Sequence, residues 1–190
     1  NHPSVKACFK KFLKFDRPVE LVHHADIPDK SGIGSSSSFT VGLINCLSYF
    51  NNQILSKKEL AFKAIDIEQN IIKETVGSQD QAIVSFGGFN RITFSKDKTF
   101  EVTPIPLTQK NQDILNQSIV LLFTGFTRDS SKVSEQQKKK ISENSEYLKK
   151  LTFIAEEAYK MLSDQNKFNI KEFGNFLDQN WQIKKKLSSK

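Results

Sequence analysis

The sequence is poor in cysteine and lacks any long apolar run, and both shortages restrict what the protein can be. Its two cysteines, Cys8 and Cys46, are far apart and form no CxxC pair, so we expect reduced thiols in a cytosolic protein, with Cys46 buried on a helix face. No apolar stretch approaches the ~20 residues that cross a bilayer, and no secretory signal pattern opens the chain. A hydrophobic content of 37% and a charged content of 26% indicate a globular chain of one sizeable domain or two small ones.

The chain has a net charge of +7, but an RNA-binding aromatic signature and a zinc-ligand spacing are missing, so the charge alone does not indicate nucleic-acid binding. Residues 128–190 hold 14 Lys or Arg against 9 Asp or Glu, including the runs Lys138–Lys140 and Lys184–Lys186. Such runs occur in nucleic-acid-binding modules and equally on solvated helix faces. We favour solvated faces and expect neither a nucleic acid nor a membrane as partner.

Hydrophobic periodicity predicts an α+β fold whose C-terminal part is helical. The expected helices are 4–15, 36–51, 56–74 with a capping box from Ser56 to Glu59, a short one after Ser78, about 129–164, and one from Ile170. The expected strands are 19–26, 89–94, 100–107 and 118–125. The middle two flank "SKDKT" as a hairpin, and the last is a continuous apolar run typical of a strand buried on both faces.

The stretch "SGIGSSSSF" (31–39) places two glycines and then four consecutive serines at the start of a predicted helix. Gly32 and Gly34 have no Cβ, so they allow positive φ and a close approach of the backbone to a ligand. The helix that follows starts with unpaired N–H groups and the positive end of its dipole, which favour an anion. A phosphate-binding loop fits this chemistry, without the Gly-Lys-Ser/Thr of a Walker loop. An ordinary capped helix is the alternative.

Glu68 lies at helical spacing inside an apolar stripe of the second predicted helix. The stripe consists of Ala61, Ala64, Ile65, Ile71 and Ile72. Burying an unpaired carboxylate is costly, so we expect Glu68 either to lie at the margin of a cleft or to have a cationic partner, which is a divalent metal ion or an Arg or Lys.

Asp80 lies twelve residues further on, in "GSQDQ". Ser78 and Gln81 have the spacing of a capping box, which puts Asp80 in the first turn of the short helix. Acids are common there because the helix dipole favours them. A carboxylate held in a capped turn can also take a proton or orient a hydroxyl.

These three features together resemble motifs of the GHMP kinases, the family of galactokinase, homoserine kinase, mevalonate kinase and phosphomevalonate kinase. "IPDKSGIGSSSSFTVGLINCL" is similar to the family's second motif, and "IEQNIIKETVGSQDQAIVSFGGFNRITF" to the acidic helix and Gly-x-x-Asp-Gln turn of the galactokinase branch. The quadruple serine, "VGSQDQ", "FGGFN", "LLFTGFTRDSS" and "NWQIKKKLSS" look like the D-glycero-D-manno-heptose 7-phosphate kinases within that family. The resemblance covers nearly the whole chain.

The resemblance implies a kinase that uses ATP and Mg²⁺. Residues 32–37 (Gly32, Ile33, Gly34, Ser35, Ser36 and Ser37) match the loop around the triphosphate. Ser36 and Glu68 match the Mg²⁺ ligands, and Asp80 matches the residue that orients or deprotonates the acceptor hydroxyl. Arg128 and Gly88 are the candidate contacts to a sugar phosphate, whose anomeric hydroxyl would be phosphorylated.

The implied architecture is an N-terminal α/β nucleotide-binding part (1–108) followed by a helix-rich C-terminal α+β part (109–190). Ile33 replaces the family's usual Leu. The first and third motifs of the family are absent, so we expect this chain to be the middle of a longer enzyme. The oligomeric state stays open, with a dimer as one option. A kinase for a galactose- or fucose-like sugar and a non-catalytic ligand-binding relative are the alternatives; retention of Ser36, Glu68 and Asp80 together favours catalysis.

Overall fold

The computed structural model describes residues 2–14, 18–26, 31–123, 125 and 144–187. These form two compact units, the first holding the helices up to Gly88 and the second beginning at Phe89. The helices of the first unit are α1 (Pro3–Phe12), α2 (Ser35–Phe50), α3 (Lys57–Ile65), the π-helix η1 (Asp66–Ile71) and α4 (Gln79–Phe86). The second unit holds β1 (Asn90–Phe94), β2 (Phe100–Pro104), α5 (Gln109–Ser118), α7 (Ser145–Ser163) and α8 (Ile170–Leu187).

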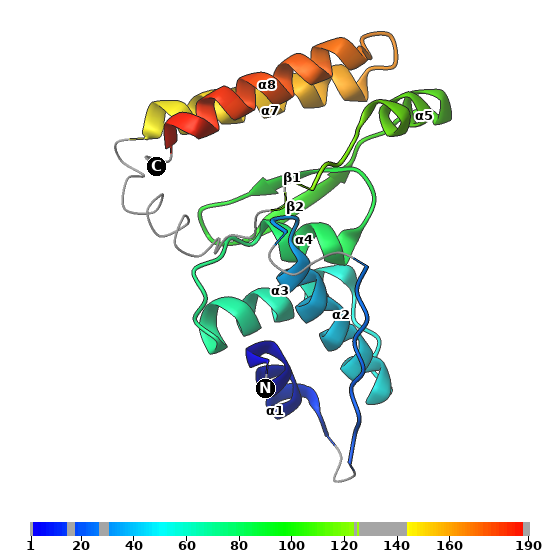
Figure 1. Cartoon of the computed structure of the whole chain (residues 1–190), viewed down its shortest axis with the longest axis vertical. Coiled ribbons are helices and arrows are strands. Elements are labelled where there is room, and N and C mark those ends of the chain that lie inside the picture. The colour runs from blue at the N-terminus through cyan, green and yellow to red at the C-terminus, as the bar shows by residue number, and fades with distance from the viewer. Residues whose placement is uncertain (1, 15–17, 27–30, 124, 126–143, 188–190) are drawn as a thin grey trace. The chain divides into compact units, whose positions relative to one another are not determined.

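In the first unit, α1, α2, α3 and η1 share one apolar core, and α4 packs against α2 and α3 (Figure 1). Pro at the first helical position of α1 fits because its missing N–H has no intrahelical partner there. The Ser56–Glu59 capping box predicted at the start of α3 is present: the Ser56 side chain accepts from the Glu59 backbone N–H, and the Glu59 side chain accepts from the Ser56 backbone N–H. The core consists of Cys8, Phe12, Val41, Leu43, Ile44, Leu47, Leu60, Ala64 and Ile67. This core and the packing of α4 against α2 and α3 position the starts of α2 and α4, where the candidate site lies.

The predicted hairpin is confirmed, whereas two predicted strands are wrong. β1 and β2 pair antiparallel from Asn90 opposite Pro104 to Phe94 opposite Phe100. Residues 19–26 and 118–123 form no strand, and Ile119 to Phe123 are at least half exposed. A strand exists only when its backbone groups pair with a neighbour, and neither segment has one within the described residues. The apolar run alone therefore did not determine its structure.

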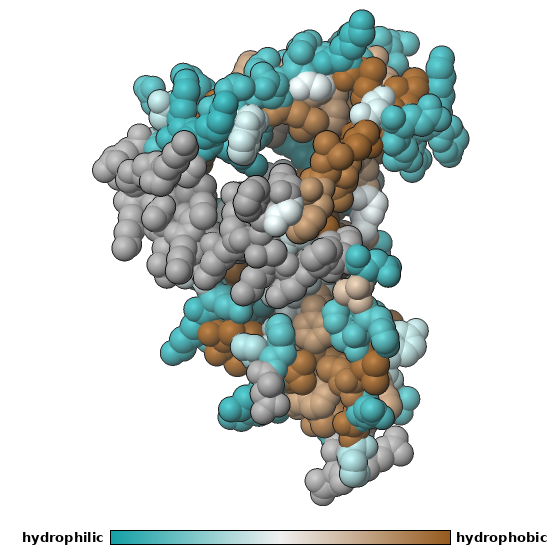
Figure 2. Space-filling model, in the orientation of Figure 1, coloured by the Kyte–Doolittle hydropathy of each residue, from teal (hydrophilic) through white to brown (hydrophobic). Residues whose placement is uncertain are grey.

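α7 and α8 form an antiparallel helical hairpin. The start of α8 at Ile170 was predicted. Helix α5, capped by the Thr108 side chain, was not predicted. The surface over α7 and α8 is mainly hydrophilic (Figure 2), as expected for solvated basic faces. Within the part of the chain that the structure describes, no helix is long and apolar enough to span a bilayer.

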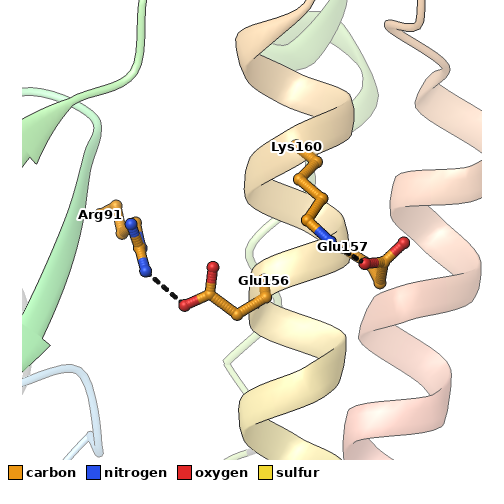
Figure 3. A network of polar contacts seen from close by, with 4 residues as sticks. All are labelled: Arg91, Glu156, Glu157 and Lys160. Carbon is orange, nitrogen blue, oxygen red and sulfur yellow. Dashed lines mark hydrogen bonds and ion pairs between the residues drawn. The ribbon is translucent and has the colours of Figure 1, made fainter.

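Arg91 joins β1 to α7 within the second unit (Figure 3). Its guanidinium donates to Glu156 and lies 4.7 Å from the ring centroid of Tyr159. Both partners of the ion pair are about a third exposed, at 34% and 39%, which limits its strength. The ion pair and the cation–π contact together are worth about 1 kcal/mol.

We expect Arg91→Ala to speed amide hydrogen exchange in β1 and α7 by about fivefold, the factor that corresponds to about 1 kcal/mol. Hydrogen exchange followed by mass spectrometry on the full-length protein measures this. Lys160→Ala is the control, because Lys160 forms its ion pair with Glu157 on its own helix and does not link α7 to β1. Equal exchange rates in both variants would mean that Arg91 does not hold the β1–β2 hairpin to α7.

Candidate active site

The turn before α2 has the backbone geometry that the glycines predict. Gly32 and Gly34 adopt φ values of 82° and 78°, in the left-handed region. Gly34 is the N-cap of α2, and no side chain of the described residues caps this helix end. The first N–H groups of α2 are therefore available to an anion. Ile33 between the two glycines is exposed.

Asp80 lies against Gly34, although 46 positions separate them in the sequence. It is exposed in the first turn of α4, as predicted. A Cβ built on Gly34 would come within 3.1 Å of Asp80 Cγ and 3.2 Å of its Oδ2. Only glycine fits here without moving the carboxylate, because real Cβ atoms seldom approach other atoms so closely. The start of α4 thus holds a carboxylate at the mouth of the glycine turn.

Glu68 is buried, with 1% of its surface exposed, and takes part in a polar cluster with Ser37 and Gln81. Ser37 Oγ donates to Glu68 Oε2 at 2.9 Å. The Gln81 amide nitrogen donates to the same carboxylate oxygen and also reaches Ser37 Oγ at 3.2 Å. We call these three residues the Glu68 cluster. Since they come from α2, η1 and α4, the cluster ties the three helices together.

Two acceptor atoms of the Glu68 cluster are buried and unused. Glu68 Oε1 and Gln81 Oε1 accept no hydrogen bond from any residue that the structure describes. Nor does any Lys or Arg in the described ranges form an ion pair with Glu68. Buried acceptors without donors are costly, so the free carboxylate oxygen fits a cation. The residues present therefore fit Mg²⁺, which binds through one or two carboxylates together with substrate phosphates.

Glu68 lies in a π-helical turn that interrupts the predicted helix 56–74. The backbone N–H of Ile72 donates to the carbonyl of Ile67, five residues earlier, and that of Glu74 donates to the carbonyl of Glu68. Such widened turns are frequent at functional sites because they redirect a side chain. Here Ile67 and Glu68 are both buried while Ile71, predicted on the buried stripe, is exposed.

The serines of the loop separate into exposed and buried ones. Ser36 is exposed, and its carbonyl accepts from the Thr40 hydroxyl at 3.2 Å. Ser37, not Ser36, is the serine that the structure brings to Glu68. Ser36 as a metal ligand stays a prediction, as does the role of Ser35 in the loop.

Of the predicted sugar contacts, Gly88 follows α4 and has a φ of 75°. The residue before it, Gly87, is the C-cap of α4 and has a φ of 62°. Arg128 lies outside the described residues.

The predicted Ser78–Gln81 capping box is wrong: Ser78 makes no side-chain cap, and its hydroxyl accepts from the Gln69 amide instead. Gln81 lies on the buried face of α4 together with Ala82 and Ser85. The spacing of these residues, one and four positions after Gln81, was the signal in the sequence that Gln81 is buried.

The predicted burial of Cys46 is wrong. Cys46 is exposed, because it lies on α2 about 200° from both Ile44 and Ser48, which face the core. Cys8 is the buried one, and desolvation, together with the charge of Glu68, raises the pKa of its thiol to about 12. The thiol of Cys8 therefore stays protonated and supplies no thiolate to the neighbouring site.

Comparison with known proteins finds similar sequences and a similar solved structure. Residues 3–88 match the family described as the GHMP kinases N terminal domain. The chain is 30% identical over 179 residues to a D-glycero-alpha-D-manno-heptose 7-phosphate kinase of Campylobacter jejuni, covering 94% of this chain and 52% of the relative. It is 25% identical to a galactokinase of Clostridium perfringens, covering 80% of this chain and 38% of the relative.

Among solved structures, the chain matches the crystal structure of a D-glycero-D-manno-heptose 1-phosphate kinase from Bacteriodes thetaiotaomicron. The TM-score is 0.69 at 26% identity, over 86% of this chain and 47% of that one. The α+β fold class is thereby confirmed. The chain spans about half the length of the relatives it matches.

The fold, the glycine-serine turn and the two carboxylates are thus similar to those expected of a small-molecule kinase domain. Residues 3–88 match the N-terminal domain of the GHMP kinase family. Within that family, the relatives named above are sugar and sugar-phosphate kinases.

Proposed function

We propose that the chain is part of an ATP-dependent kinase that phosphorylates a hydroxyl of a sugar phosphate. The contact between Asp80 and Gly34 carries this proposal, because it places a carboxylate beside the turn that would hold the phosphates. Phosphoryl transfer depends mainly on positioning and charge neutralisation, so a backbone cradle and an aligned hydroxyl are its essential parts.

Each part has a role in this reaction. The backbone from Gly32 to Ser36 and the N-terminus of α2 would bind the nucleotide phosphates. Asp80 would accept the proton of the acceptor hydroxyl while orienting its oxygen toward the terminal phosphate. Glu68 and Ser36 would hold Mg²⁺, which when bound neutralises charge that develops on the phosphate oxygens.

The acceptor proposed is D-glycero-D-manno-heptose 7-phosphate, phosphorylated on its anomeric hydroxyl. This rests on the motifs shared with the heptose 7-phosphate kinases and on the 30% identical relative of that name. Arg128 is proposed to bind the existing phosphate, since a guanidinium can bind phosphate oxygens with two parallel hydrogen bonds.

An assay of ADP release by the full-length protein over a panel of sugars and sugar phosphates tests the acceptor. We expect turnover of heptose 7-phosphate, and we expect Arg128→Ala to raise KM for that sugar far more than for ATP. Arg91→Ala is the matched control, since Arg91 already pairs with Glu156. Efficient turnover of free galactose or fucose with none of heptose 7-phosphate would contradict the acceptor and leave the kinase assignment intact.

A further inference from the structure

The Glu68 cluster contains two residues, Ser37 and Gln81, that hold one oxygen of the Glu68 carboxylate and leave the other free. Both are at most 5% exposed, and both donate to Oε2. A carboxylate whose two oxygens were equivalent could rotate between several partners. Here the donors select one oxygen, so the orientation of Oε1 is fixed by groups that do not need to touch a cation themselves.

Gln81 also connects this carboxylate to Asp80. The two residues are neighbours in the first turn of α4, with Asp80 exposed against Gly34 and Gln81 buried against Glu68. Gly34 and Ser37 lie within the first turn of α2, so the starts of α2 and α4 meet at two points. A displacement of Gln81 would therefore change the position of Glu68 relative to both the glycine turn and Asp80.

We propose that Ser37 and Gln81 are positioning residues that fix the Glu68 carboxylate for a divalent cation. The inference rests on the proposed function and adds to it two residues that act through Glu68. The cost of keeping the acceptor Glu68 Oε1 buried is offset when a cation is bound. Hydrogen-bonding partners of metal-binding carboxylates typically contribute 10–100-fold to metal affinity.

The test is titration of the full-length protein with Mn²⁺, with and without ADP, following free Mn²⁺ by electron paramagnetic resonance. Gln81→Met removes the amide at nearly constant length, and Ser37→Ala removes the hydroxyl. We expect Gln81→Met to weaken Mn²⁺ binding by about 10–100-fold and Ser37→Ala to weaken it in the same direction. Glu68→Gln should abolish binding at this site.

Two control variants remove similar groups that do not touch Glu68. Gln69→Met removes the neighbouring amide, which donates to the Val76 carbonyl and Ser78 hydroxyl. Ser85→Ala removes a buried hydroxyl one turn further along α4. Both should bind Mn²⁺ as the wild type does. Wild-type affinity in Gln81→Met and Ser37→Ala, or an equal loss in the controls, would overturn the proposal.

Gln81→Glu decides the matter if Gln81→Met does not fold. It places a second carboxylate beside Glu68, so the Tm without metal should fall, and Mn²⁺ should raise it by more than it raises the wild-type Tm. A purely structural Gln81 would give a lower Tm that Mn²⁺ does not recover, and this result would overturn the proposal.

Kinase turnover is measured separately, so that the two proposals can fail independently. Mn²⁺ binding that depends on Glu68 and Gln81 in a protein without kinase activity would support the positioning role and remove the proposed function. Full turnover together with Mn²⁺ affinity that is insensitive to Gln81 and Ser37 would support the proposed function and remove the positioning role.

Discussion

The Asp80→Asn variant of the full-length protein is expected to keep wild-type affinity for ATP and to lose at least about 10²-fold in kcat, the loss typical of removing a general base. Asn has the shape of Asp and is also well tolerated at a helix start, so the fold should survive. It cannot accept a proton from the acceptor hydroxyl. ATP affinity should be unchanged because the loop backbone and the start of α2, not Asp80, are proposed to bind the phosphates.

Steady-state kinetics with saturating ATP and sugar measure kcat, and isothermal titration measures nucleotide affinity. Glu146→Gln is the control, since Glu146 is likewise an exposed acid in the first turn of a helix, α7. That variant should keep its kcat. If Asp80→Asn behaved in the same way, Asp80 would be an acid that merely stabilises the start of α4.

The helices of the first unit could be predicted from the sequence because their signals are local. Helical spacing of apolar residues gave α2 within a residue at each end. The pair Ser56 and Glu59 gave the start of α3, since a capping box uses only neighbouring backbone groups. The hairpin β1–β2 was predictable for the same reason, because its turn joins strands that pair with each other.

The failures occur where a side chain or a strand depends on a distant partner. Residues 19–26 and 118–125 have strand-like patterns, but a pattern does not supply the neighbouring strand. Gln81 has the spacing of a local capping box, yet its amide bonds Glu68 and Ser37 from other helices. Glu68 was singled out correctly as a buried carboxylate, whereas its neighbours Ser37 and Gln81 follow only from the packing of α2 against α4.

The second large effect is expected from Gly34→Ala. Two costs apply at this position. A residue with a Cβ is strained at a φ of 78°, at about 1–2 kcal/mol. The new methyl would also lie 3.1 Å from Asp80 Cγ, so the carboxylate must shift. A displacement of about 1 Å of a reacting group can cost about 10²-fold in rate.

Gly32→Ala separates these two costs. Gly32 has a φ of 82°, nearly that of Gly34, but a Cβ there meets no atom of the described residues within 4 Å. Both variants therefore carry the same backbone strain, and only Gly34→Ala displaces Asp80. We expect both to lose stability by a similar amount, and Gly34→Ala to lose about 10²-fold more in kcat than Gly32→Ala.

A double-mutant cycle with Asp80→Asn identifies the origin of that loss. If Gly34→Ala acts by displacing the Asp80 carboxylate, it should lower kcat far less in the Asp80→Asn background than in the wild type. The kcat of the four proteins and their Tm values give the coupling. Equal losses in both backgrounds, or equal kcat in the two glycine variants, would mean that Gly34 is needed only for the shape of the turn and that its contact with Asp80 has no part in catalysis.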